Sequence, residues 1–135
     1  MSDQKDRITC HILDTTKGTP ARSVRVKLSL ASPSTFSPGP VFESQTDEDG
    51  RIKVWLPYSS ATSSGEVPVY TLEDIFTSLS GTTRWTLTFD TAAYFGGEDK
   101  TFFPEVVVVF TVAEGQRYHV PLLLAPYSYS TYRGS

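Results

Sequence analysis

The stretch Arg22–Leu30, with the sequence RSVRVKLSL, decides the fold class of this chain. Polar and apolar residues alternate along it, and the apolar positions are Val24, Val26, Leu28 and Leu30. An alternation with period two is typical of a β-strand that has one face in a core and the other in water. The segment is therefore predicted to be a strand of a sheet that covers a core.

The same pattern recurs elsewhere in the chain. It predicts further strands at Ile8–Leu13, Arg51–Leu56, Trp85–Asp90 and Tyr118–Leu124, and the tail Tyr127–Tyr132 is predicted to be a last strand.

Two of the predicted strands have a particular burial pattern. In Arg51–Leu56, the alternation places Ile52, Val54 and Leu56 on the core side and Trp55 on the outer side. The unbroken apolar run Val106–Phe110 indicates a strand that is buried on both faces.

Turn and loop signals separate the strands. Thr16–Pro20 joins the first two strands, Asp47–Gly50 leads into the third segment, and Ala113–Gln116 is predicted to close a hairpin. The segments Ala31–Pro40 and Pro57–Tyr70, rich in serine and proline, are expected to be mobile surface loops.

Helix is scarce in this sequence. One short helix is indicated by the helical spacing of Leu72, Ile75, Phe76 and Leu79, with a capping box at Thr71 and Asp74 and a stop at Gly81. A second is indicated at Thr91–Phe95, before two glycines. Many short strands with so little helix predict an all-β fold, a two-sheet antiparallel β-sandwich with one or two short helices.

Length and charge exclude several classes of protein. The 135 residues provide for a single domain, residues 1–135. Twelve basic residues (Lys+Arg 12) against 15 acidic ones give a net charge of −3, and no basic cluster occurs, so we expect no nucleic-acid partner. The longest apolar run, Val106–Phe110, is far shorter than the ~20 residues of a membrane span, so we expect no membrane partner. One cysteine excludes an intrachain disulfide and a four-thiolate zinc site.

Three polar residues stand out as candidates for catalysis. His11 and His119 are the only histidines, and each lies on the strand face opposite the apolar stripe, as Arg51 does on its own strand. Imidazoles and a guanidinium suit proton transfer and the stabilisation of an anion. Because water screens charges on an open sheet face, such a site needs a second subunit to cover it. From spacing alone, a solvated charge after a turn is the simpler interpretation of Arg51, and a structural or solvated role is the commoner one for a lone histidine.

Other catalytic and cofactor motifs are absent from the sequence. It contains no GxSxG, GxGxxG, GxxxxGK[ST] or HExxH. Two histidines without an evident third ligand predict no metal site. The residues themselves therefore support neither a nucleotide-binding site nor a metal site.

Several motifs resemble those of the 5-hydroxyisourate hydrolases, the transthyretin-like enzymes of urate breakdown. They cover nearly the whole chain and comprise Ile8–Asp14 with Gly18–Ala21, Asp49–Arg51, Phe89–Phe95, Phe103–Val106, Tyr118–Leu124 and Pro126–Ser135. The ending Tyr-Arg-Gly-Ser resembles the enzymes specifically, since transthyretins share only the preceding Pro-Tyr-Ser-Tyr-Ser-Thr. Residues 31–40 and 57–83 resemble insertions relative to shorter members of the family, and their role is left open.

The resemblance implies an assembly and a set of site residues. The family folds as a transthyretin-like sandwich of eight strands and forms a homotetramer, a dimer of dimers, with active sites in a channel between dimers. The catalytic residues carried over by motif are His11, Arg51, His119 and Ser135. Those carried over for substrate binding are Tyr132, Arg133 and Gly134, with no metal and no cofactor.

The resemblance also implies a reaction. It is the hydrolysis of a cyclic amide-like bond in 5-hydroxyisourate, which gives 2-oxo-4-hydroxy-4-carboxy-5-ureidoimidazoline. His11 and His119 would handle the water and its protons, Arg51 would stabilise charge on the attacked carbonyl, and Ser135 would hydrogen-bond the water or the ring. Which histidine is the base is left open. The alternative is a transthyretin-type binding protein for an aromatic small ligand, and the expected location is the cytoplasm, with the peroxisome as alternative.

Overall fold

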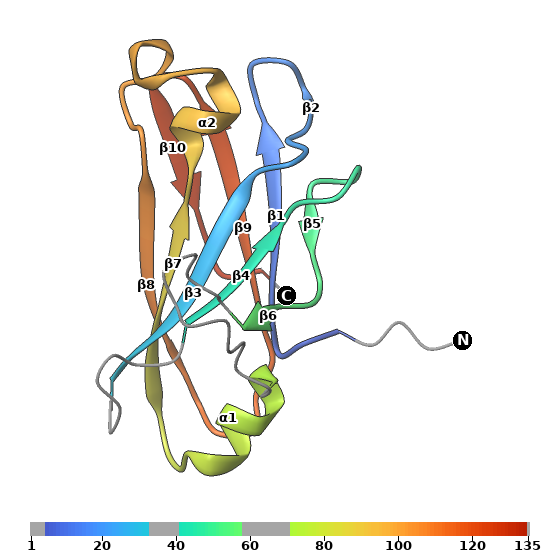
Figure 1. Cartoon of the computed structure of the whole chain (residues 1–135), viewed down its shortest axis with the longest axis vertical. Coiled ribbons are helices and arrows are strands. Elements are labelled where there is room, and N and C mark those ends of the chain that lie inside the picture. The colour runs from blue at the N-terminus through green and yellow to red at the C-terminus, as the bar shows by residue number, and fades with distance from the viewer. Residues whose placement is uncertain (1–4, 33–40, 58–70, 135) are drawn as a thin grey trace, which may run out of the picture.

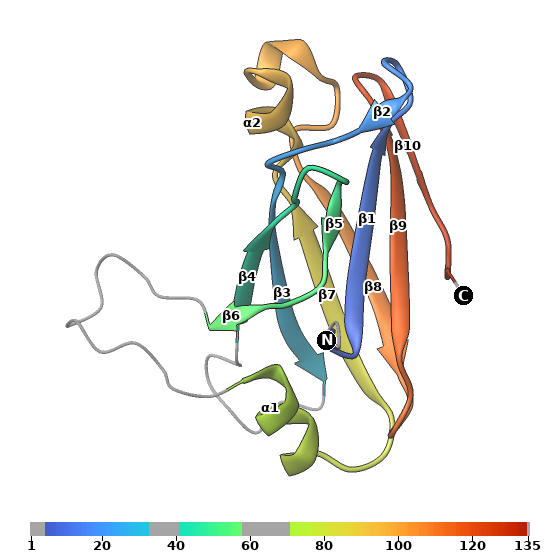
Figure 2. The ribbon, with the colours of Figure 1, turned by 90° about the vertical axis from the view of Figure 1, so that its right-hand side faces the viewer.

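The structure, a computed structural model, describes residues 5–32, 41–57 and 71–134. Two sheets pack face to face, with α1 and α2 at opposite ends of the sandwich (Figure 1, Figure 2). The first sheet has the order β10-β9-β1-β2, with β5 also paired to β1, and the second has the order β6-β4-β3-β7-β8. The elements are β1 (Ile8–Asp14), β2 (Thr19–Pro20), β3 (Arg25–Ser32), β4 (Val41–Gln45), β5 (Arg51–Ile52), β6 (Leu56–Pro57), α1 (Leu72–Ser78), β7 (Thr83–Phe89), α2 (Thr91–Phe95), the 3-10 helix η1 (Glu98–Lys100), β8 (Val106–Val112), β9 (Tyr118–Ala125) and β10 (Ser128–Thr131).

The core lies between the two sheets and is built from the inward positions of the alternating strands. Trp85, Leu87 and Phe89 of β7 are fully buried, and Ile8 and Ile12 of β1 face them from the other sheet's inner side. Burying one such side chain contributes about 1.5–3 kcal/mol. The predicted all-β two-sheet sandwich with short helices is therefore confirmed.

The pairing of β1 with β9 is parallel, whereas the other strand pairs are antiparallel. Ile8 lies opposite Tyr118 and the register continues to Asp14 opposite Leu124. Hydrophobic alternation fixes which face a residue occupies but not which strand lies beside it. The sequence pattern therefore contained no sign of this parallel pair, which brings the two ends of the chain together.

The prediction of a strand at Arg51–Leu56 is correct only for its first two residues, which form β5. The chain leaves the ladder after Ile52, and only β6 resumes pairing, with β4. Trp55 is buried in the core, and its indole N–H donates to the carbonyl of Ile8 (2.8 Å). Val54 and Leu56 are 49% and 64% exposed, so the predicted faces of these residues are reversed.

The prediction that Val106–Phe110 is buried on both faces is also wrong. β8 is the edge strand of the second sheet, next to β7 alone within the described residues. Its outward residues Val107 and Val109 are 49% and 58% exposed. Apolar residues on both faces here mark an edge with one uncovered side rather than an interior strand.

The segment Ala113–Gln116 is a turn but does not close a hairpin. The N–H of Gln116 donates to the carbonyl of Ala113 (3.2 Å), as in a tight turn. The strands on either side, β8 and β9, belong to different sheets. The chain crosses between the layers at this point, and the N–H of Tyr118 then donates to the carbonyl of Arg7 in the first sheet (2.6 Å).

Both predicted helices are present. α1 begins with a complete capping box between Thr71 and Asp74, and α2 is capped by Asp90 and ends at Gly96, which has a left-handed conformation (φ 96°). Among the described residues, none of the helices is long and apolar enough to cross a membrane.

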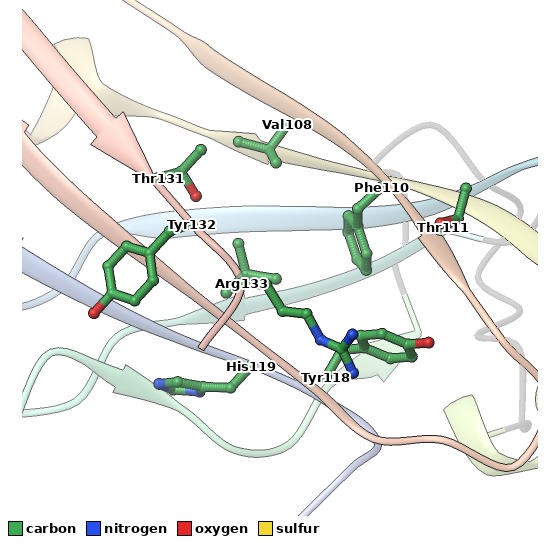
Figure 3. A pocket seen from close by; sticks show the side chains of 9 residues that line it. Val108, Phe110, Thr111, Tyr118, His119, Thr131, Tyr132 and Arg133 are labelled. Atoms are coloured by element: carbon green, nitrogen blue, oxygen red, sulfur yellow. The ribbon is translucent and has the colours of Figure 1, made fainter. Parts of the chain in front are cut away.

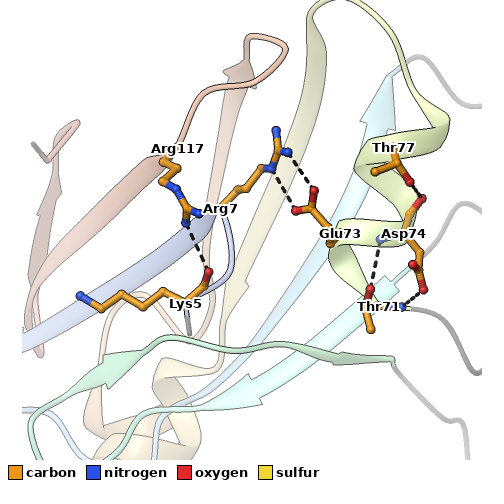
Figure 4. A network of polar contacts seen from close by, with 7 residues as sticks. All are labelled: Lys5, Arg7, Thr71, Glu73, Asp74, Thr77 and Arg117. Carbon is orange, nitrogen blue, oxygen red and sulfur yellow. Dashed lines mark hydrogen bonds and ion pairs between the residues drawn. The ribbon is translucent and has the colours of Figure 1, made fainter. Parts of the chain in front are cut away.

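A polar network ties α1 to the start of the first sheet (Figure 4). The guanidinium of Arg7 donates to both carboxylate oxygens of Glu73 at 3.0 and 2.8 Å, and that of Arg117 donates to the carbonyl of Lys5. These contacts fix the backbone that leads into β1. The greater part of the two predicted mobile loops, residues 33–40 and 58–70, lies outside the described residues.

Candidate active site

His11 lies in the middle of β1 on its outward face. Along this strand the buried positions alternate with half-buried ones, so that Cys10 and Ile12 enter the core while Thr9 and His11 point away from it. Complete burial raises the pKa of the Cys10 thiol, which keeps it protonated. The imidazole of His11 is therefore presented on a sheet face whose reverse side is a packed core.

The parallel register of β1 and β9 brings the second histidine to the first. Thr9 lies opposite His119, and His11 lies opposite Pro121, two positions further along β9. The ring centroids of His11 and His119 are 6.3 Å apart, and their planes make an angle of 34°. The two imidazoles therefore share one patch of the outer face of the first sheet.

Arg51 joins this patch through the turn that precedes it. The carboxylate of Asp47 accepts hydrogen bonds from the N–H groups of Asp49 and Arg51 (2.9 and 3.0 Å), and β5 then places Arg51 directly opposite His11. Gly50 makes this approach feasible. Its φ is +73°, and a Cβ at this position would lie 2.5 Å from the carbonyl oxygen of Ile12.

His119 is held on two sides. The Thr9 hydroxyl lies 2.8 Å from its Nδ1. On another side, the N–H of Gly134 donates to the His119 carbonyl (2.8 Å), and a Cβ on Gly134 would lie 2.8 Å from the ring atom Cδ2. Only a glycine lets the C-terminal segment lie this close to the ring.

The remaining C-terminal residues lie around a pocket of about 390 Å³ beside His119 (Figure 3). Arg133 extends away from the His119 ring, with its guanidinium carbon 4.8 Å from the centre of the Tyr118 ring. Tyr132 lines the pocket and is 57% exposed. Val108 and Phe110 of β8 form the opposite, apolar wall.

The charges around the histidines favour their neutral forms. Partial burial lowers the pKa of His11, and the adjacent Arg51 cation lowers it further, against a hydrogen bond with the Asp49 backbone that raises it. Partial burial also lowers the pKa of His119, followed by the charges of Arg51, His11 and Lys5. From an ordinary value of about 6.5, both shifts leave neutral imidazoles at pH 7. A neutral imidazole beside a fixed cation can accept a proton and afterwards return it.

The structure thus brings together His11, Arg51, His119 and Gly134, places Tyr132 at the adjoining pocket and directs Arg133 toward Tyr118. Ser135 lies outside the described residues. Sequence reasoning missed Thr9, although the alternation put it on the same face as His11. Its contact with His119 depends on the parallel pair, which left no signal in the sequence. In the described part of the chain, no group of three or more His, Cys, Asp or Glu residues is arranged to hold a metal ion.

Comparison with known proteins adds a second line of argument. The model of the HIUase/Transthyretin family matches residues 8–134. This chain belongs to that family. The probable 5-hydroxyisourate hydrolase of Schizosaccharomyces pombe is 37% identical, and the match covers 98% of this chain and 94% of that one. The uric acid degradation bifunctional protein TTL of Arabidopsis thaliana is 42% identical over 95% of this chain, which spans only 37% of that longer protein.

Solved structures of family members share the fold. The 5-hydroxyisourate hydrolase of Klebsiella pneumoniae matches with a TM-score of 0.60 and 30% identity, over 95% of this chain and 98% of that one. Sea bream transthyretin, solved in complex with thyroxine, matches with a TM-score of 0.64 and 25% identity, over 96% and 95%. The fold therefore occurs in a hydrolase and in a protein that binds a small aromatic molecule, and the side chains on the sheet face must distinguish the two.

Proposed function

We propose that this member of the HIUase/Transthyretin family is a 5-hydroxyisourate hydrolase that opens the ring of its substrate to give the ureidoimidazoline carboxylate. The observation that carries the proposal is the meeting of two neutral imidazoles and a guanidinium on one sheet face. The near full-length similarity to named 5-hydroxyisourate hydrolases supports the same substrate.

The reaction we propose is the hydrolysis of a cyclic amide without a cofactor. One imidazole removes a proton from water, and the water oxygen forms a bond to the ring carbonyl carbon. Arg51 stabilises the negative charge that develops on the carbonyl oxygen. The carbon–nitrogen bond then breaks as the leaving nitrogen takes up the proton that the imidazole removed from water, and the carboxylic acid that forms releases its own proton to solvent to become the carboxylate.

The C-terminal residues complete the proposed site. Gly134 holds the tail against His119, and Tyr132 stands at the mouth of the adjoining pocket. Ser135 comes directly after Gly134 in the sequence, so its hydroxyl is proposed to hydrogen-bond the water or the substrate ring. Arg133 is proposed to contribute to substrate binding, with Tyr118 supporting its guanidinium.

We also propose that the protein assembles as a homotetramer, a dimer of dimers. The edge strand β8 of the second sheet exposes Val107 and Val109. At the β10 edge of the first sheet, Tyr129 in β10 and Tyr127 just before it are 41% and 74% exposed. Unpaired edges with apolar side chains favour pairing with another copy. A second subunit over the histidines would also exclude water and strengthen the charges in the site.

The second candidate function is the binding of an aromatic small ligand, which the likeness to transthyretin solved with thyroxine supports. A binding protein of this type has no need of two imidazoles beside a guanidinium. It predicts ligand binding without turnover.

A ring-opening assay tests the proposal. Urate oxidase generates 5-hydroxyisourate from urate in the cuvette, and its absorbance decay is followed with and without this protein. We expect the decay to accelerate in proportion to protein concentration, and to return close to the spontaneous rate with His119→Ala at equal concentration. Decay at the spontaneous rate with folded wild-type protein would reject the hydrolase and leave the binding function.

A further inference from the structure

Thr9 and His119 are direct neighbours across the parallel pair of β1 and β9, although 110 positions separate them in the sequence. The hydroxyl oxygen of Thr9 lies 2.8 Å from Nδ1 of His119. This contact is inside the site of the proposed hydrolase, so a role for Thr9 in turnover rests on that proposed function.

The hydrogen of the Thr9 hydroxyl decides the direction of the bond. A hydroxyl can donate to a bare Nδ1 or accept from a protonated one. Within the described residues, Nδ1 of His119 is the one hydrogen-bond partner of this half-buried hydroxyl. If Nδ1 carried the proton, the hydroxyl would accept, and its own hydrogen would have no acceptor among the described residues.

We propose that Thr9 donates its hydroxyl proton to Nδ1 of His119 and thereby holds this imidazole as the tautomer that carries its proton on Nε2. Thr9 is then a positioning residue, because it acts on the reaction only through the ring that it orients. Gly134 lies on another side of the ring, where its N–H donates to the His119 carbonyl and a Cβ would lie only 2.8 Å from Cδ2.

The assignment separates the roles of the two histidines. With Nε2 protonated and Nδ1 accepting from Thr9, a neutral His119 has no bare nitrogen to take a proton from water, and its Nε2–H is a hydrogen-bond donor to the substrate. His11 is therefore the imidazole that takes the proton of water, and it gives this proton to the leaving nitrogen.

The tautomer itself is the first test. Long-range proton–nitrogen NMR on protein with isotope-labelled histidine distinguishes a protonated Nε2 from a protonated Nδ1, and His11→Gln assigns the two sets of signals. At a pH where the rings are neutral, we expect His119 to show a protonated Nε2 in the wild type and in Thr9→Ser. A protonated Nδ1 in the wild type would overturn the inference, whatever the rate of ring opening.

Turnover of two variants is the second test. Thr9→Val keeps the shape and removes the donor, so we expect a mixture of tautomers and about a tenfold loss of kcat with little change in KM. Thr9→Ser should restore both. Thr15→Val is the control, since Thr15 follows β1 directly and its hydroxyl donates to a carbonyl outside the site, that of Leu124. It should leave the tautomer and kcat unchanged.

The outcomes separate this inference from the proposed function. Thr9→Val with wild-type kcat and an unchanged Nε2–H signal would reject the role of Thr9 and leave the hydrolase intact. A wild type without ring-opening activity would reject the hydrolase, while the NMR result still decides the hydrogen bond. If Thr9→Val does not fold, the wild-type spectrum and the Thr9→Ser variant decide the question.

Discussion

The two outer faces of the sandwich both carry polar groups but arrange them differently. On the second sheet, Lys27 of β3 lies opposite Glu43 of β4, and Arg25 lies near Asp90 and Glu105 around an open groove of about 820 Å³. On the first sheet, His11, His119 and Arg51 lie together, and among the described residues the Arg51 guanidinium makes no ion pair.

The two faces differ in whether their charges are balanced by neighbours of opposite sign. Opposite charges across strands stabilise a sheet surface and need no further explanation. On the first sheet, partial burial and the Arg51 cation lower the pKa of both histidines, and shifted pKa values of this kind cluster at functional sites. The groove on the second sheet is larger than the pocket beside His119, so cavity size alone would have selected the second sheet.

The largest expected effect comes from removing the cation on each face in turn. Arg51→Ala should reduce kcat/KM for ring opening by about 10²–10³, because the developing oxyanion loses its charged partner. Arg25→Ala, the matched change on the second sheet, should leave kcat/KM within about twofold, and neither should lower Tm appreciably, since exposed arginines contribute little to stability. Equal loss of activity in both variants, measured by the absorbance assay, would remove the distinction between the faces.

A second comparison uses two glycines with close neighbours. Gly134→Ala would push a methyl group against His119 Cδ2, so we expect a loss of turnover of about 10²-fold from ring displacement and a nearly unchanged Tm. Gly50→Ala would meet the Ile12 carbonyl in a left-handed conformation, so it should destabilise the fold by about 1–3 kcal/mol. Thermal unfolding and the ring-opening assay together separate the two outcomes. A Gly134→Ala enzyme with wild-type turnover would mean that the tail does not set the ring.

A smaller effect is expected at the turn that delivers Arg51. Asp47→Ala removes the acceptor of two backbone N–H groups, and a net loss of about 1 kcal/mol should reduce kcat/KM about fivefold. Asp47→Asn retains an acceptor oxygen and should recover most of the activity. If both variants are equally impaired, the charge of Asp47 matters rather than its hydrogen bonds.

The smallest effect concerns pH. Because burial and neighbouring cations lower the pKa of both histidines, kcat/KM should fall on the acid side with a midpoint below about 6.5. Lys5 lowers the pKa of His119, so Lys5→Gln should move this midpoint slightly upward, and high salt should abolish the difference. Lys17→Gln, in the turn between β1 and β2, serves as the control. A downward shift with Lys5→Gln would contradict the assigned sign.

The fold could be predicted from the sequence where a local rule determines it. The alternation in β3, β7 and β9 and the capping box of α1 predicted elements that are present, because side-chain period and capping are properties of neighbouring residues. The segment from Lys53 to Leu56 could not be predicted, since Trp55 is placed by a hydrogen bond to a distant strand. The burial of β8 on both faces was wrongly predicted, because an edge strand with apolar side chains on both faces has the same composition as an interior strand.

Alternation predicted which strand face each candidate site residue occupies, but it did not predict which of these residues lie next to one another. The outward positions of His11, His119 and Arg51 came from alternation, and the motif resemblance pointed to the same residues. That His11 and His119 meet depends on the parallel register of β1 and β9, and the contact of Thr9 with His119 depends on it too. Residue spacing does not determine which strands become neighbours, so Thr9 appeared only with the structure.

The same parallel register has a consequence for biogenesis. β1 is made early and β9 late, so the chain must remain open while more than three quarters of it is synthesised, and the closing of this long loop slows folding. No nascent or shortened polypeptide that lacks β9 can carry both imidazoles in one place. Ring-opening capacity should therefore arise in a single late step, and limited proteolysis during refolding should find protection of β1 and activity emerging together.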